Sequence, residues 1–145
     1  MPIQAVQHVR RMRGGAQSHL MRADDGYFYV VKFQNNPQHL RVLANELLGT
    51  RLAEQAALPV ATPELIWVDP WLVRNTPDLT IQLAGRSLPC QSGLQFGSRY
   101  VAGLTNGAAE IFDFLPEPML HQVKNLEAFA GALAFDKWTC NANGR

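Results

Sequence analysis

The sequence predicts an α+β fold, in which a sheet of about five antiparallel strands carries one long helix and a second, helical part follows. Aromatic and β-branched residues fill positions 27–33, the clearest strand pattern in the chain. Apolar residues then recur at helical spacing through the forties, and a second such pattern follows residue 119. Strands that precede the main helical part are typical of an α+β fold.

The amino-terminal strands are expected to form a meander. Residues 3–9 alternate loosely in hydropathy, and residues 19–23 resume an extended pattern after a pair of glycines. Asp24-Asp25-Gly26 is a turn signal, because glycine tolerates positive φ. The expected order is therefore strand, glycine loop, strand, turn and strand.

One long helix is expected over about 37–57. Asn36 can cap this helix, and Pro37 suits its first turn. The helix ends before Pro59. Its apolar stripe consists of leucines at helical spacing, namely Leu40, Leu43, Leu47, Leu48 and Leu52.

Shorter elements follow as far as residue 104. A short apolar run at 65–68 is bounded by prolines and is typical of a strand. Asp69 and Pro70 favour a brief helix that ends by Pro77. The remaining expectations are a weak strand at 80–83, a loop over 85–93 and a strand at 95–101.

The carboxy-terminal part of the chain, residues 105–145, is expected to be helical. Glycine and proline interrupt its beginning, and a helix is expected over about 119–135. A polar segment, 136–145, follows that helix. The sheet and the first helix would then belong to residues 1–104.

Composition excludes several classes of protein. The chain has 145 residues, of which 47% are hydrophobic and 17% charged, as expected for a globular protein with one sizeable core. A net charge of +1 gives no strong field, so nucleic acid is not an expected main partner. No apolar run approaches the roughly 20 residues needed to span a bilayer, so no membrane association is expected. The amino terminus lacks a signal-peptide pattern.

Cysteine and histidine give little indication of a metal site. Cys90 and Cys140 are too few and too far apart for a disulfide framework or a zinc site, so a reducing cytoplasm is the expected compartment. The four histidines share no metal-ligand spacing. Among them, His19 is expected at the surface, near the glycine loop.

The first candidate site is the loop Gly14-Gly15-Ala16-Gln17-Ser18, between two expected strands. Phosphate oxygens need backbone N–H groups at close range, and small side chains permit that approach. The alternative is that the paired glycines form only a hairpin turn.

The second candidate site is Lys32 with Glu46. Lys32 ends the strongest strand, where a buried charge without a partner is costly to desolvate. Glu46 lies in the middle of the first helix, at the border of its apolar stripe. Kinases pair a strand Lys with a Glu of the following helix. The alternative is that both residues are solvated surface groups.

The third candidate site is the pair Asp136 and Asn141, just after the second helix. This is the spacing of a phosphoryl-transfer loop, in which the Asp orients the attacking hydroxyl and the Asn helps to hold a metal ion. The alternative is that Asp136 is simply a polar residue at the end of a helix.

Taken in this order, the residues resemble the HipA-like kinase family. The similar stretches are Gly15-Ala16-Gln17, Val31-Lys32, Asn45-Glu46, Phe96-Gly97-Ser98-Arg99-Tyr100 and Phe135-Asp136 with Asn141-Ala142-Asn143. The resemblance implies a protein-kinase-like amino-terminal lobe plus the start of a helical carboxy-terminal lobe. It also implies ATP with magnesium, and phosphorylation of a protein Ser or Thr or of a small hydroxyl substrate.

The resemblance also implies roles for the candidate residues. The backbone of residues 14–18 would hold phosphates, and Lys32 would contact them while Glu46 orients it. Asp136 would be the base and Asn141 a metal ligand. In a second register Asn143 stands where the base belongs, and an amide cannot accept the proton.

In both registers the metal-binding Asp that follows in the family is not in the sequence. We therefore expect an incomplete kinase domain with little or no activity, because a metal ligand supplies much of the electrostatic stabilisation of phosphoryl transfer. Its last helix would lack a partner and favour self-association. The alternative is a non-catalytic module that binds a nucleotide or a partner protein.

Overall fold

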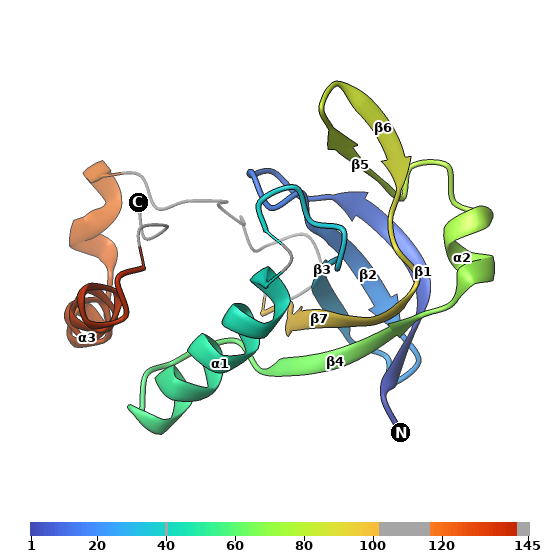
Figure 1. Ribbon diagram of the computed structural model, residues 1–145. Coiled ribbons are helices and arrows are strands. Elements are labelled where there is room, and N and C mark those ends of the chain that lie inside the picture. Colours follow the sequence, from blue (N-terminus) through green and yellow to red (C-terminus); the bar gives the residue numbers. More distant parts are fainter. Residues whose placement is uncertain (40, 102–116, 142–145) are drawn as a thin grey trace. The chain divides into compact units, whose positions relative to one another are not determined.

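The computed structural model describes residues 1–39, 41–101 and 117–141 (Figure 1). The chain divides into two compact units, one of Met1–Thr50 with Ala61–Val101 and the other of Arg51–Val60 with Ala102–Arg145. Each unit is described by itself below. The first contains all the strands, and the second contains the carboxy-terminal helices.

The first unit is built on a closed barrel of five strands, in the order β1-β2-β3-β7-β4. Its strands are β1 (Ile3–Arg11), β2 (His19–Ala23), β3 (Phe28–Lys32), β4 (Pro63–Val68) and β7 (Gly93–Arg99). The α+β class and the number of strands in the main sheet are thus as expected.

The expectation of a purely antiparallel sheet was wrong at one place. β1 and β4 pair in parallel, with Ile3 opposite Ile66 and Gln4 opposite Trp67, and this pair closes the barrel. The other neighbouring strands are antiparallel. A pairing between strands some sixty residues apart leaves no local signal, because each strand keeps the same alternation whichever way its neighbour runs.

The core lies inside the barrel. Along β3, Tyr29 and Val31 are buried at 2% and 0% exposure, whereas Val30 and Lys32 are only half-buried. Because successive side chains of a strand point to opposite faces, Lys32 lies on the outer face of the barrel wall. The helix α2 (Pro70–Arg74) adds Leu72 to the core.

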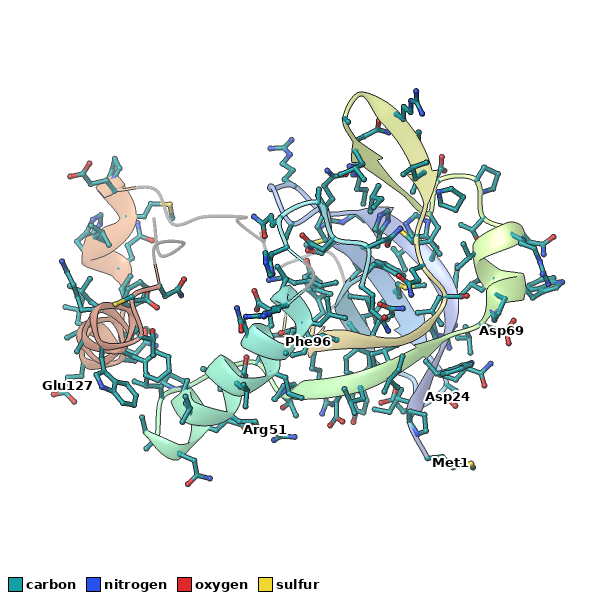
Figure 2. The ribbon with its side chains drawn as sticks, viewed as in Figure 1. Met1, Asp24, Arg51, Asp69, Phe96 and Glu127 are labelled. Carbon is teal, nitrogen blue, oxygen red and sulfur yellow. The ribbon has the colours of Figure 1, made fainter. Side chains whose placement is uncertain are left out.

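The brief helix expected after Asp69 is present as α2. The carboxylate of Asp69 accepts a hydrogen bond from the backbone N–H of Trp71 at 2.6 Å and caps the helix, with Pro70 at its first position. Figure 2 labels Asp69 at the start of this helix.

A two-stranded hairpin, β5 (Thr80–Leu83) and β6 (Arg86–Pro89), forms a separate small sheet. The turn residues Ala84 and Gly85 both have positive φ, 49° and 78°, as a type I′ turn requires. The loop expected over 85–93 was therefore wrong at 86–89. Every residue of β6 is exposed, so this strand has no buried face that would give an alternating pattern.

The long helix α1 (Val42–Gln55) begins later than expected. The side chain of Asn36 accepts a hydrogen bond from the N–H of Gln38 at 2.9 Å, which forms a local turn. Asn36 therefore does not cap the helix. α1 ends in a Schellman motif, in which Leu58 N–H donates to the Ala53 carbonyl at 3.0 Å and Ala57 has a φ of 57°.

The second unit contains a 3₁₀ helix, η1 (Glu117–Gln122), and the helix α3 (Leu126–Trp138). The helix expected over about 119–135 therefore starts later, because residues 117–122 form the separate 3₁₀ turn that contains Pro118. The breaker-rich stretch before it lies mostly outside the described residues. None of the helices in the described parts of the chain has the length and apolarity that a membrane span requires.

Candidate functional site

Lys32 and Glu46 form an ion pair that joins β3 to α1. Lys32 Nζ donates to Glu46 Oε1, and the two side chains are 20% and 34% exposed. Lys32 is the last residue of β3, and Glu46 lies one turn into α1, on the turn that faces the strand. The sequence order alone suggested this pair, and the structure brings the two groups together. Since both are partly withdrawn from water, each charge stabilises the other more than in an exposed pair.

An apolar surface adjoins Lys32 on the outer face of the barrel. The register pairs Lys32 with Phe96 and Val30 with Ser98, so these four side chains share one face. Leu20 of β2 pairs with Val30 and extends the surface. Leu20 and Phe96 are each 3% exposed. Sequence reasoning did not pick out Leu20, Val30 or Ser98 as site residues, although counting back two positions from Lys32 finds Val30.

The glycine loop lies between β1 and β2, at one end of the barrel wall. Met12 N–H donates to the Ser18 carbonyl at 2.8 Å and closes the loop, and Gln17 N–H donates to the Gly14 carbonyl at 3.2 Å. Gly14 has a φ of 116°, a conformation that strongly favours glycine. Within the described residues, the N–H groups of Gly15 and Ala16 have no hydrogen-bond partner.

Side-chain hydrogen bonds tie this loop to the segments around it. Gln17 Oε1 accepts from the backbone N–H of Gln82 at 2.6 Å, and Gln17 Nε2 donates to the Gln82 carbonyl at 2.9 Å. Arg11 also donates to Gln17 Oε1. On the other side, Asn36 Nδ2 donates to the Ala16 carbonyl at 2.8 Å. The paired glycines therefore belong to an anchored loop and not to a simple two-residue hairpin turn.

His19 lies beside the glycine loop, but the expectation that it is a surface residue was wrong. Its ring is fully buried, with Nδ1 at 3.0 Å from His8 Nε2 and Nε2 at 3.0 Å from the Thr80 carbonyl. Nε2 must donate to that carbonyl, so Nδ1 accepts from His8. Burial, with a smaller contribution from His8, lowers the pKa of His19 to about 4.

Burial also favours the neutral forms of the two groups that approach the His19 ring, His8 and Cys90. Burial lowers the pKa of His8, although Asp78 opposes this effect. The Cys90 thiol lies 3.7 Å from His19 Nε2, and burial raises its pKa to about 12. The described residues contain no cluster of three His, Cys, Asp or Glu side chains that could hold a metal ion.

Asp136 and Asn141 lie together at the end of α3. Asn141 Nδ2 donates to Asp136 Oδ1 at 2.9 Å, and Asn141 N–H donates to the Asp136 carbonyl at 2.8 Å. Cys140, with a φ of 54°, completes a Schellman motif. Asp136 is thus in the last turn of the helix, whereas the polar segment was expected to start there. Asn143 lies outside the described residues.

The candidate residues fall into two groups. The glycine loop, Lys32 and Glu46 belong to the first unit, while Asp136 and Asn141 belong to the second.

Comparison with known proteins identifies the family. A search of curated proteins and a search of solved structures each found no match. A family model described as HipA-like kinase matches residues 5–144, nearly the whole chain. The chain therefore belongs to the HipA-like kinase family.

Proposed function

We propose that this chain binds ATP with magnesium in a kinase-like site, the kind of site that in active kinases transfers phosphate to a protein Ser or Thr or to a small hydroxyl substrate. The ion pair between Lys32 and Glu46 is the observation that carries the proposal. It joins the third strand to the following helix, as the corresponding pair does in kinases.

Lys32 would neutralise the phosphates of the nucleotide. An ammonium on a flexible stem needs a fixed partner to stay in one position, and Glu46 supplies that partner from a rigid helix. The adjacent outer face offers half-buried Val30, flanked by the buried side chains of Leu20 and Phe96, as an apolar contact for the base. The N–H groups of Gly15 and Ala16 suit phosphate oxygens.

Asp136 would be the base and Asn141 a magnesium ligand. Carboxylate and amide oxygens are ligands that Mg²⁺ accepts, so the types of side chain in this pair fit the ion. The hydrogen bond from Asn141 Nδ2 fixes the carboxylate of Asp136. Bound magnesium would supply charge stabilisation to the transferring phosphoryl group.

Calorimetric titration of the chain with ATP and magnesium tests the proposal. Lys32→Met should weaken ATP binding about tenfold or more, because a charge-assisted contact to phosphate is lost. Lys124→Met is the matched control, since Lys124 is exposed and lies in the second unit. Failure of the unaltered chain to bind ATP would overturn the proposal. Binding without phosphate transfer to any acceptor would favour a non-catalytic nucleotide-binding module.

A further inference from the structure

The β5–β6 hairpin is hydrogen-bonded to the glycine loop through backbone groups of β5. Gln17 Oε1 accepts a hydrogen bond from the backbone N–H of Gln82 at 2.6 Å, and Gln17 Nε2 donates a hydrogen bond to the Gln82 carbonyl at 2.9 Å. Both hydrogen-bonding groups of one β5 residue are thus satisfied by a single loop side chain. A second contact, from His19 to the Thr80 carbonyl at 3.0 Å, ties the beginning of β2 to the same strand.

Gln17 occupies a conformation that its neighbours must maintain. Its φ of 48° lies in the left-handed region, which is unfavourable for a residue with a Cβ atom. Arg11 donates to the same Oε1 atom that receives Gln82 N–H. Three hydrogen bonds therefore converge on one side chain of the loop and offset the cost of its backbone conformation.

Most of the hairpin is surface, while Ile81 anchors β5 in the core. All residues from Gln82 to Pro89 are exposed, so few packing contacts restrain its tip. Its position is coupled to the loop mainly where Thr80 and Gln82 meet His19 and Gln17. A displacement of β5 would break both backbone contacts with Gln17 at once.

We infer that Gln17 is a positioning residue, which locks the glycine loop to strand β5 and thereby holds the Gly15 and Ala16 N–H groups in place for the nucleotide's phosphates. This inference rests on the proposed function. Gln17 acts here through its side chain, and its own N–H is already used by the Gly14 carbonyl. Strand β5 thereby supports the loop that would hold the phosphates.

The test compares Gln17→Ala with Gln82→Ala. The first removes the side chain that makes all three contacts and keeps the Cβ atom, so the φ cost is unchanged. The second is the matched control, because Gln82 takes part through its backbone and its exposed side chain makes no hydrogen bond within the described residues. Affinities for MgATP and for adenosine are measured by calorimetry, and loop opening is measured by amide hydrogen exchange over residues 14–18.

Gln17→Ala should weaken MgATP binding about tenfold, the effect of losing one to two net hydrogen bonds, and leave adenosine binding unchanged. Its loop amides should exchange faster than those of the unaltered chain, and Gln82→Ala should match that chain in both measurements. If Gln17 only stabilised the fold, Gln17→Ala would weaken ATP and adenosine binding equally. That equal loss, or unchanged ATP affinity in Gln17→Ala, would overturn the inference while the proposed function stands. Absence of ATP binding in the unaltered chain would overturn the proposed function and the inference with it.

Discussion

Gly97 of β7 lies directly against the side chain of Ile66 in β4. A Cβ atom built on Gly97 would overlap Cγ1 of Ile66, and it would lie 3.2 Å from Cδ1 of the same side chain. Ile66 is fully buried in the barrel core, so it has little room to move. Gly97 therefore allows two strands of the barrel to approach with a large core side chain between them.

Replacing Gly97 by Ala should destabilise the protein by about 1–3 kcal/mol, the usual cost of overpacking a core. Urea unfolding followed by circular dichroism measures this change. Gly49→Ala is the matched control: a Cβ there meets nothing within 4 Å, and Gly49 lies inside α1. Gly49→Ala should raise the free energy of unfolding by about 0.5–1 kcal/mol, since Ala suits a helix better than Gly. Equal effects of the two substitutions would contradict the account of the barrel wall.

Ala57 should be replaceable by Gly with a gain in stability. It stands at the left-handed position that ends α1, with a φ of 57°, where a Cβ atom costs about 1 kcal/mol. Ala57→Gly should therefore raise the free energy of unfolding by about that amount. Ala56→Gly, one position earlier, relieves no left-handed conformation and should lower the free energy of unfolding. A loss of stability in Ala57→Gly would mean that the helix does not end in this motif.

The buried His19 should make stability depend on pH. Its pKa is about 4 in the folded protein and ordinarily about 6.5, so between these two pH values the folded state binds fewer protons than the unfolded state. The contribution of the neutral ring to the free energy of unfolding is fully present above pH 6.5 and is lost as the pH falls toward 4. The loss amounts to at most about 3 kcal/mol over that range.

His19→Gln should remove this part of the pH dependence, measured as the difference in unfolding free energy between pH 7 and pH 4.5. Carboxylates contribute to acid unfolding in both proteins, so the difference between the two isolates the histidine. His121→Gln serves as the control, because His121 is exposed in the second unit. An unchanged slope in His19→Gln would show that His19 is not held neutral by the fold.

Local patterns predicted the parts of the structure that depend on neighbouring residues. The strand that ends at Lys32 is rich in aromatic and β-branched residues, and the cap of α2 depends only on Asp69 and Pro70. The order of a strand lysine and a helix glutamate was enough to suggest the ion pair between Lys32 and Glu46, which the structure contains.

Long-range contacts could not be predicted in this way. The parallel pairing of β1 with β4, the contact of Gln17 with Gln82 and the burial of His19 under Thr80 each join residues about sixty positions apart. Nothing in the residues near Gln17 indicates that its amide has a backbone partner on a distant strand. The same distance explains why His19 was expected at the surface.

The central claim is that Glu46 orients Lys32 toward the phosphates of ATP. A double-mutant cycle of Lys32→Met and Glu46→Gln, measured by calorimetric titration with MgATP, tests it most directly. Each single variant should bind about tenfold more weakly, and the double variant should bind no more weakly than Lys32→Met alone. If the losses in MgATP binding free energy of the two single variants simply added in the double variant, the claim would be contradicted, because the two residues would then act independently.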